Sequence, residues 1–250
     1  MGRLRTFVEK ISRKRVLVRH LPKDLDSARI YVSPDASLRL WRPHLESDLF
    51  DLAREFVHPG DTVWDIGANV GLFTLSAAQK AGPNGNVIAI EPDIWLASLL
   101  QRTAAVQPST FAPINIMPVA VSGAVGIETL HVAKRGRASN HLSSVPENSQ
   151  AGGTRETFKV LCITLDWLLE QTHPPSLVKI DVEGSEFDLL RGSHTLLSKV
   201  RPTLLCEVRD RTRAEITGIF KTYNYRLYDW NSTPRVEVST AAFNTLAIPR

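Results

Sequence analysis

The stretch VWDIGANVGLFTL, Val63–Leu75, carries an apolar run into an acid, Asp65, and then into two glycines, Gly67 and Gly71. Residues 61–66 predict a buried strand, and residues 71–82 predict a helix. Glycines in the turn between them would let the chain bend sharply and let a ligand lie against bare backbone. The spacing D-x-G-x-x-x-G differs from the G-x-G-x-x-G of dinucleotide sites. Because Asp65 would repel a pyrophosphate and attract a cation, the stretch predicts a site for a ligand with an amino group.

Outward from this turn, strand-like and helix-like segments alternate from about residue 58 to the end of the sequence. Near-continuous apolar strands separated by amphipathic helices predict an α/β fold whose mostly parallel sheet is covered on both faces. Two late strands have no helix between them, so we expect an antiparallel pair at one edge. The predicted strands span residues 61–66, 86–91, 114–122, 126–133 (beside 114–122), 158–163, 177–182, 203–208, 225–230 and 243–248. The predicted helices span residues 71–82, 94–106 (with Asp93 as N-cap), 164–171, 185–200 and 213–224.

The first 57 residues predict a small N-terminal β/α cap, followed by a main domain over residues 58–250. The cap would hold a basic arm, short strands at 15–20, 28–33 and 37–41, and one helix at 44–57. That helix is amphipathic, since one of its faces carries the apolar side chains of Leu45, Leu49, Leu52, Ala53 and Phe56.

Composition is that of an ordinary globular protein, with 250 residues, 43% hydrophobic and 22% charged. The absence of an apolar run of roughly 18 residues argues against a transmembrane segment, and the absence of a secretory signal predicts a cytoplasmic location. Cys162 and Cys206 lie in apolar strand-like runs and are expected to be buried free thiols. Much of the net charge of +4 lies in residues 3–20, which carry seven Lys or Arg against one Glu. This run could touch anionic lipid or RNA, but a solvated arm or helix is the commoner case.

The carboxyl ends of the predicted parallel strands carry a series of acids. Such ends share one edge of the sheet, where ligands of open α/β folds bind. Glu91, at the end of the second strand, is placed to accept hydrogen bonds from both hydroxyls of a ribose. A cationic amino acid joined to a ribose describes S-adenosylmethionine. The residues at these strand ends are Asp65, Glu91, Asp93, Ala120–Ser122, Asp181, Glu183 and Glu207.

Several segments together resemble the FkbM family of class I methyltransferases. The matching pieces are VWDIGANVGLFTL, VIAIEPD, PVAVS, ITLDWLL, LVKIDVEGSEFDLLRG, LLCEV and NTLAIP, which run from about residue 60 to 249. The first is shared by many methyltransferases, whereas KIDVEGSE with the following LLRG is more specific. The resemblance implies a Rossmann-like fold with a seven-stranded, mostly parallel sheet and an antiparallel C-terminal hairpin. It also implies S-adenosylmethionine as donor and a hydroxyl of a sugar, glycolipid or secondary metabolite as acceptor.

The resemblance also implies roles for individual residues. The methionine moiety of the donor would be flanked by Asp65, Gly67, Asn69 and Gly71. Glu91 would hold the ribose, Asp93, Ile94 and Trp95 would border the adenine, and Ala120 and Val121 would line its other face. The bulky Trp95 departs from the pattern, and either narrows or stacks on the adenine pocket or fills core space.

Methyl transfer to oxygen needs an aligned acceptor and gains from a base that removes its proton. Asp181 and Glu183 are candidates, because they end the strand expected beside Asp65, and Lys179 on that strand could offset the crowded acids. In the structural alternative, Ser185 and Asp188 form a capping box, and Glu183 and Glu186 complement the helix dipole.

The long stretch over residues 133–156 predicts an irregular functional or disordered loop. His141 within it is a third candidate base or substrate contact, although most surface histidines are neither. Arg135, Arg137, Ser139 and Asn140 could bind hydroxyls or phosphates, whereas His194 is expected to be structural. No group of residues has convincing metal-ligand spacing.

Four functions remain open at this level. An O-methyltransferase leads, because the D/N-P-P-Y/F signature of nucleobase amino-group methylation is absent. An RNA methyltransferase that uses the basic N-terminus predicts salt-sensitive RNA binding. The glycine spacing argues against an NAD-dependent oxidoreductase, and the intact series of acids argues against a silent binding protein. The acceptor and the oligomeric state are not identified.

Overall fold

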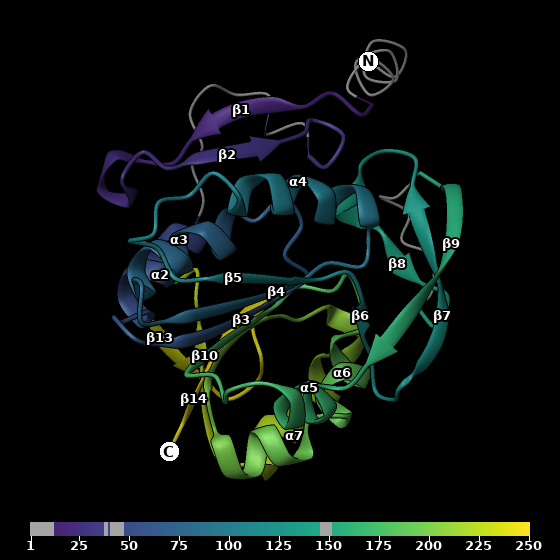
Figure 1. Ribbon diagram of the computed structural model, residues 1–250. Helices are drawn as coiled ribbons and strands as arrows, with labels where there is room; N and C mark the ends of the chain where they lie inside the picture. The colour runs from purple at the N-terminus through teal and green to yellow at the C-terminus, as the bar shows by residue number, and fades with distance from the viewer. Residues whose placement is uncertain (1–12, 38–39, 41–47, 146–151) are drawn as a thin grey trace.

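The structure is a computed structural model, and it describes residues 13–37, 40, 48–145 and 152–250. An eight-stranded sheet in the order β13-β12-β14-β11-β10-β3-β4-β5 runs through the centre (Figure 1). Its five parallel strands are short, and four of them are largely buried, as their apolar runs predicted, whereas β5 at the edge is only partly buried. They are β3 (Thr62–Ile66), β4 (Asn86–Ile90), β5 (Ile114–Met117), β10 (Leu177–Ile180) and β11 (Thr203–Glu207).

The C-terminal strands add an antiparallel part to this sheet. β12 (Tyr225–Asp229) pairs antiparallel with β14 (Asn244–Pro249), as expected. However, β14 inserts between β11 and β12, and the short β13 (Val236–Val238) pairs with the outer side of β12. The expected seven-stranded sheet therefore has eight strands, because the connection from β12 to β14 forms an additional edge strand.

Helices cover both faces of the sheet, as the alternating pattern predicted (Figure 1). One face carries α2 (Asp48–Phe56), α3 (Leu72–Ala81) and α4 (Ile94–Ala104), which share one hydrophobic core. The other carries α5 (Leu165–Gln171), α6 (Glu186–Arg191) and α7 (Arg213–Thr222), which share a second core. The helix expected over residues 185–200 is interrupted, since α6 is followed by a separate π-helical turn, Leu196–Val200.

A separate four-stranded sheet has the order β6-β9-β7-β8. It contains β6 (Ala120–Val121), β7 (Gly126–Ala133), β8 (His141–Leu142) and β9 (Thr154–Ile163). The prediction that 126–133 pairs beside 114–122 was wrong: β7 pairs antiparallel with β9, and β6 pairs parallel with β9. Leu130 and Val132 of β7 are buried, as expected for an antiparallel ribbon with one face packed and one face in water. The apolar residues Ile127 and Leu161 lie opposite each other and are exposed, which an alternation of apolar and polar residues does not predict.

At the N-terminus, β1 (Leu17–His20) and β2 (Arg29–Val32) form an antiparallel pair that packs against α4. Leu25, Ile30 and Val32 are fully buried in the same core as α3 and α4. On α2, Leu52 and Ala53 are buried as predicted, together with Phe50. Leu45 and most of the strand expected at 37–41 lie outside the described residues, and the domain boundary at residue 57 stays a prediction.

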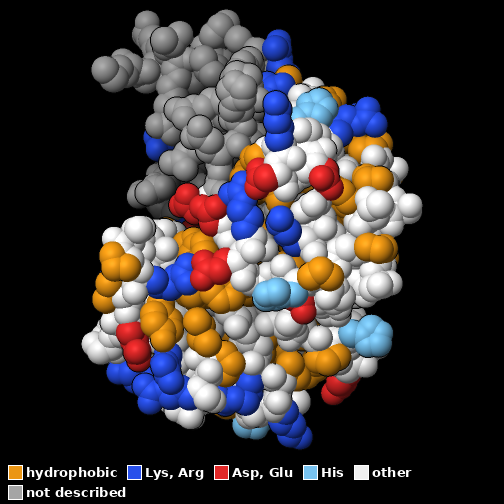
Figure 2. Space-filling view, turned by 90° about the vertical axis from the view of Figure 1, so that its left-hand side faces the viewer, with side chains coloured by type: hydrophobic (Ala, Val, Ile, Leu, Met, Phe, Trp, Pro, Cys, Tyr) orange, Lys and Arg blue, Asp and Glu red, His pale blue; other side chains and the backbone are white. Residues whose placement is uncertain are grey.

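Further observations bear on the predictions from composition. Cys162 and Cys206 are both buried and unpaired, as expected. Within the described ranges, no helix is long and apolar enough to cross a membrane. Figure 2 shows one face of the molecule, on which Lys and Arg side chains are interspersed with Asp, Glu and hydrophobic side chains.

The neighbours β3 and β10 form the topological switch point of the sheet. From β3 the chain continues outward through β4 and β5, whereas from β10 it continues through β11 in the opposite direction. In open α/β sheets, this divergence opens a crevice at the carboxyl ends of the two strands. The fold therefore places Gly67 and Asp181, which follow β3 and β10, at the expected ligand site.

Candidate active site

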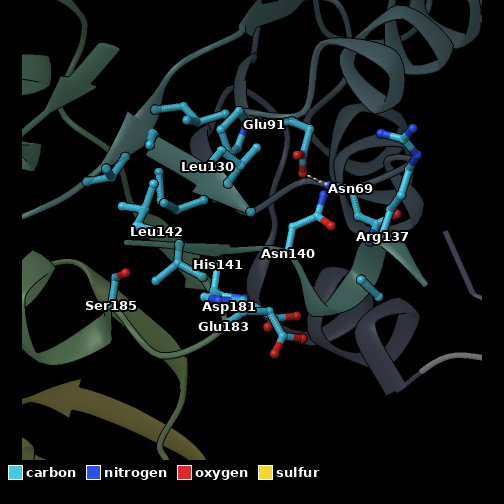
Figure 3. Close-up of a pocket in the computed structure, with 18 residues that line it drawn as sticks. Asn69, Glu91, Leu130, Arg137, Asn140, His141, Leu142, Asp181, Glu183 and Ser185 are labelled. Atoms are coloured by element: carbon cyan, nitrogen blue, oxygen red, sulfur yellow. Dashed lines mark hydrogen bonds between the residues drawn. The ribbon is translucent and has the colours of Figure 1, made fainter. Parts of the chain in front are cut away.

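A cavity lies at this crevice (Figure 3). The floor comes from the ends of β3, β4 and β10, and the roof comes from residues 137–142 with Leu130 of β7. The predicted site residues that line it are Gly67, Asn69, Glu91, Ala120, Val121, His141, Asp181 and Glu183. Four predicted residues lie outside the lining: Asp65, Gly71, Asp93 and Ile94.

The turn after β3 is shaped by contacts within the protein. Gly67 has φ +78°, and a Cβ there would lie 1.9 Å from the carbonyl oxygen of Asp181. Gly71 has φ +89°, and its Cβ would lie 2.2 Å from a methyl carbon of Leu100 on α4. Gly67 is thus required by the close approach of a backbone carbonyl, and Gly71 by its positive φ. That packing brings the turn and the end of β10 side by side at the cavity.

Asp65 is fully buried beneath the turn. Its carboxylate accepts a hydrogen bond from Thr74 Oγ1 at 2.5 Å and lies 3.3 Å from Lys179 Nζ. Lys179 also donates to the Gly67 carbonyl at 2.7 Å and lies 3.6 Å from Asp181 Oδ2. Burial lowers the pKa of Lys179, but Asp65 and Asp181 outweigh that effect, so its pKa is raised and it stays charged. Lys179 therefore offsets the negative charge of the acids, as the sequence suggested. Asp65 supports the turn from below and does not reach the cavity surface.

Glu91 lines the cavity from the end of β4. Its two carboxylate oxygens accept hydrogen bonds from the backbone N–H groups of Asn69 and Asp93, both at 2.8 Å (Figure 3 marks the first). Burial raises the pKa of Glu91 to about 7 despite these two donors. Because each oxygen can accept a second hydrogen bond, the carboxylate can still receive two hydroxyls from a ligand.

Asp93 lies next to Glu91 but faces away from the cavity. One oxygen caps α4 by accepting from Trp95 N at 3.0 Å. The other accepts from Arg137 at 2.5 Å and from Asn140 Nδ2 at 2.8 Å. Ile94 is 65% exposed, and Trp95 packs partly against the core, with the Arg137 guanidinium 5.0 Å from its ring centroid. Of the two possibilities open for Trp95, this arrangement favours core packing.

A cluster of acids follows β10 and β11 at the opposite end of the cavity. Asp181 is half-exposed, and Glu183 has φ +56° and pairs with the guanidinium of Arg209. Arg209 also lies 3.6 Å from Glu207. Burial, reinforced by the charge of Asp181, raises the pKa of Glu183 to about 8 and that of Glu207 to about 7. Glu207 was placed at this edge by the sequence but not assigned to the site, and Arg209 was missed because nothing local connects it with Glu183.

The start of α6 differs from the predicted capping box. Ser185 occupies the N-cap position, but its side chain makes no capping hydrogen bond to Asp188 or its neighbours. Glu186 instead accepts from Gly184 N at 2.8 Å. The Ser185 hydroxyl is buried, has no hydrogen-bond partner and lines the cavity. An unsatisfied buried hydroxyl at a cavity wall is a candidate ligand contact.

The described part of residues 133–156 contains regular structure where the sequence predicted an irregular loop. A 3₁₀ turn (Arg137–Ser139) leads into β8, which pairs with β7. This pairing brings His141 to the wall of the cavity. Its ring also stacks on that of His131, which is not part of the lining, with 5.2 Å between centroids. Asn140 also lines the cavity, whereas Arg135 and Ser139 do not. His194 lies away from the site and contacts the Tyr223 hydroxyl at 2.8 Å.

The chain is similar in sequence to several known proteins. The family described as Methyltransferase FkbM domain matches residues 65–227. A hexuronic acid methyltransferase, AglP of Haloferax volcanii, is 29% identical over 157 residues, which cover 62% of this chain and 59% of that protein. Methyltransferase 1 of Beauveria bassiana is 28% identical over 184 residues, which cover 67% of this chain and 72% of that protein. The crystal structure of methyltransferase FkbM from Methylobacillus flagellatus superposes with a TM-score of 0.49 at 16% identity, over 79% of this chain and 50% of that one. The match thus spans about three fifths of the archaeal relative's length.

Proposed function

The chain belongs to the FkbM methyltransferase family, and from that premise we propose that it methylates a hydroxyl oxygen of a sugar, glycolipid or secondary metabolite, with S-adenosylmethionine as donor. The observation that carries the proposal is one cavity that is lined by both Glu91 and Asp181. The first suits a ribose, and the second suits an acceptor hydroxyl. The archaeal relative, a hexuronic acid methyltransferase, supports a sugar as the acceptor class.

The residues present fit S-adenosylmethionine. When bound, it supplies a methyl group that is already activated on a sulfonium. Glu91 would hold the ribose, because its two oxygens keep free acceptor capacity after binding two backbone N–H groups. Ala120 and Val121 offer apolar wall for the adenine, and the backbone at Gly67 and Asn69 borders the remaining space. Asp65 and Gly71 would support this site from beneath, since neither lines the cavity.

The acceptor would lie at the other end, among Asp181, Glu183 and His141. Of the three, Asp181 fits the role of general base best, because it is half-exposed and the charged Lys179 lies 3.6 Å away. Glu183, with its pKa raised to about 8, holds a proton at neutral pH and is suited to donate a hydrogen bond. Orientation of the hydroxyl by these groups would supply much of the rate enhancement.

The test is release of S-adenosylhomocysteine when the protein and S-adenosylmethionine are mixed with fractionated glycans, glycolipids and metabolites. Mass spectrometry should then find one added methyl in an acceptor, and chemical or enzymatic cleavage should place it on oxygen. A methyl found on nitrogen would overturn the assignment to oxygen. If the protein binds neither S-adenosylmethionine nor S-adenosylhomocysteine, the proposed donor is wrong and the proposed function fails.

A further inference from the structure

One buried guanidinium holds the roof of the cavity. Arg137 is 5% exposed, and all three of its nitrogens contact carboxylates: Nε with Asp35 at 3.1 Å, Nη1 with Asp93 at 2.5 Å and Nη2 with Glu156 at 2.9 Å. Three carboxylates therefore fix the guanidinium from three directions. An arginine engaged in this way holds its surroundings in place and has little capacity left for a ligand.

Asp35 reaches the roof from the N-terminal part of the chain, outside the family match that begins at residue 65. It is 4% exposed and also pairs with Arg155, which donates to its two oxygens at 2.9 and 2.8 Å. The backbone strengthens the link, because Arg137 N donates to the Asp35 carbonyl at 2.8 Å. Ala138 N donates to the Ala36 carbonyl at 3.1 Å. The segment around Asp35 therefore borders the roof along two consecutive residues.

Asp93 connects the roof to the floor. Its Oδ2 accepts from Arg137 and from Asn140, a roof residue that lines the cavity. Its own backbone N–H donates to Glu91 Oε1 at 2.8 Å. A continuous series of contacts thus runs from Asp35 through Arg137 and Asp93 to Glu91.

We propose that Asp35 and Arg137 are positioning residues: they hold residues 137–142 over the cavity, and so set the affinity for the donor. The inference rests on the proposed function. A roof that must be ordered when the ligand binds costs conformational entropy, which a roof ordered in advance does not. The N-terminal segment is then part of the active-site architecture.

The test compares four variants by calorimetry with S-adenosylhomocysteine and by hydrogen exchange. Asp35→Asn should weaken binding about tenfold or more and should raise exchange in residues 137–142. Arg137→Lys should do the same, because it keeps the charge but loses the three-way fork. It also keeps the proposal testable if Asp35→Asn fails to fold. In turnover, KM for S-adenosylmethionine should rise more than kcat falls.

Two controls separate positioning from general stability. Asp24→Asn breaks an exposed N-terminal ion pair, Asp24–Arg54 at 2.7 Å, and should leave affinity and roof exchange unchanged. Arg155→Gln removes one partner of Asp35 but keeps the contact between Asp35 and Arg137, so affinity should stay within about threefold even if the protein unfolds more easily. The inference is overturned if Asp35→Asn binds S-adenosylhomocysteine as tightly as wild type. It is also overturned if Arg155→Gln loses as much affinity as Asp35→Asn. If the wild-type protein binds no S-adenosylhomocysteine, the proposed function fails. Separately, unchanged hydrogen exchange of residues 137–142 in Asp35→Asn would overturn the role of Asp35.

Discussion

Asp181 and Glu183 follow the same strand, yet their carboxylates have different neighbours. Asp181 is half-exposed beside Lys179, whereas Glu183 is more buried, has a left-handed backbone and is paired with Arg209. Two acids two residues apart therefore lie in different electrostatic surroundings at one site. This difference underlies the assignment of Asp181 as the base and of Glu183 as a proton-holding group.

Asp181→Asn should separate catalysis from binding. The substitution keeps the shape of the side chain, and Lys179 keeps its contact with Asp65. Turnover with an identified acceptor should fall by roughly 10²-fold or more, the lower range for a positioned base. Affinity for S-adenosylhomocysteine, measured by calorimetry, should change less than threefold. Near-normal turnover would transfer the role of base to Glu183 or His141.

The raised pKa of Glu183 predicts how stability depends on pH. In the unfolded chain this carboxyl loses its proton near 4.5, whereas in the folded protein it keeps the proton to about 8. The folded state binds more protons between these values, so the free energy of unfolding should fall as pH rises from about 4.5 to 8. The Gln side chain of Glu183→Gln cannot ionise. Between pH 5 and pH 8, urea titrations should therefore show the free energy of unfolding of this variant falling by roughly 1 to 3 kcal/mol less than that of wild type.

The matched control is Glu215→Gln, which changes an exposed glutamate on α7. Its stability should follow the wild-type pH dependence. If the free energy of unfolding of Glu183→Gln falls with pH as much as that of wild type, then the burial of Glu183 and the charge of Asp181 do not raise its pKa as described.

At the level of elements, the strand–turn–helix unit around Gly67 is fixed by its neighbour β10 rather than by its own sequence alone. Gly67 fits because β3 and β10 pair in register, with Ile66 opposite Ile180, which brings the two following backbones together. The turn, the Asp181 backbone and Lys179 thus form one packed unit at the cavity.

Gly67→Ala should therefore be severe. The added methyl would meet a backbone carbonyl that cannot rotate away, so we expect a loss of roughly 3 to 5 kcal/mol of unfolding free energy in urea titrations. Gly60→Ala is the matched control, because Gly60 has φ +90° but no atom within 4 Å of the place that an added methyl would take. It should cost only roughly 1 to 2 kcal/mol of backbone strain. Equal losses in the two variants would show that φ strain, not the approach of β10, sets the cost.

For the whole molecule, the site joins segments from across the chain, so a ligand that fills it should stabilise the fold globally. Ligand at about 100 times its dissociation constant adds about 2.7 kcal/mol. For a chain of this size that corresponds to a rise in Tm of roughly 5 to 10 °C. We expect this rise in scanning calorimetry with S-adenosylhomocysteine, and none with NAD.

Glu91→Ala tests the same prediction at the ribose end. It should remove most of the rise at the same ligand concentration, since charged hydrogen bonds contribute about 1.5 to 3 kcal/mol each. A rise with NAD instead would favour the oxidoreductase alternative. An undiminished rise in Glu91→Ala would remove Glu91 from the site.

Much of the architecture was determined by the sequence itself. Apolar runs with helical segments between them predict a parallel sheet covered on both faces, and glycines after an acid predict the sharp turn at Gly67. The strand-end acids Glu91, Asp181 and Glu183 could be placed at one edge, because the carboxyl ends of parallel strands always meet there. Each of these features depends on local periodicity or on a few adjacent residues.

Only the tertiary structure decided which distant segments meet. Asp35 and Arg137 are 102 residues apart, and Glu183 and Arg209 are 26 apart, with no local pattern that connects either pair. The insertion of β14 between β11 and β12, the pairing of β7 with β9, and the inward side chain of His141 are of the same kind. Such contacts depend on how complete elements pack, because the partner of a strand edge or a buried charge is selected from the whole chain by shape and complementary polarity.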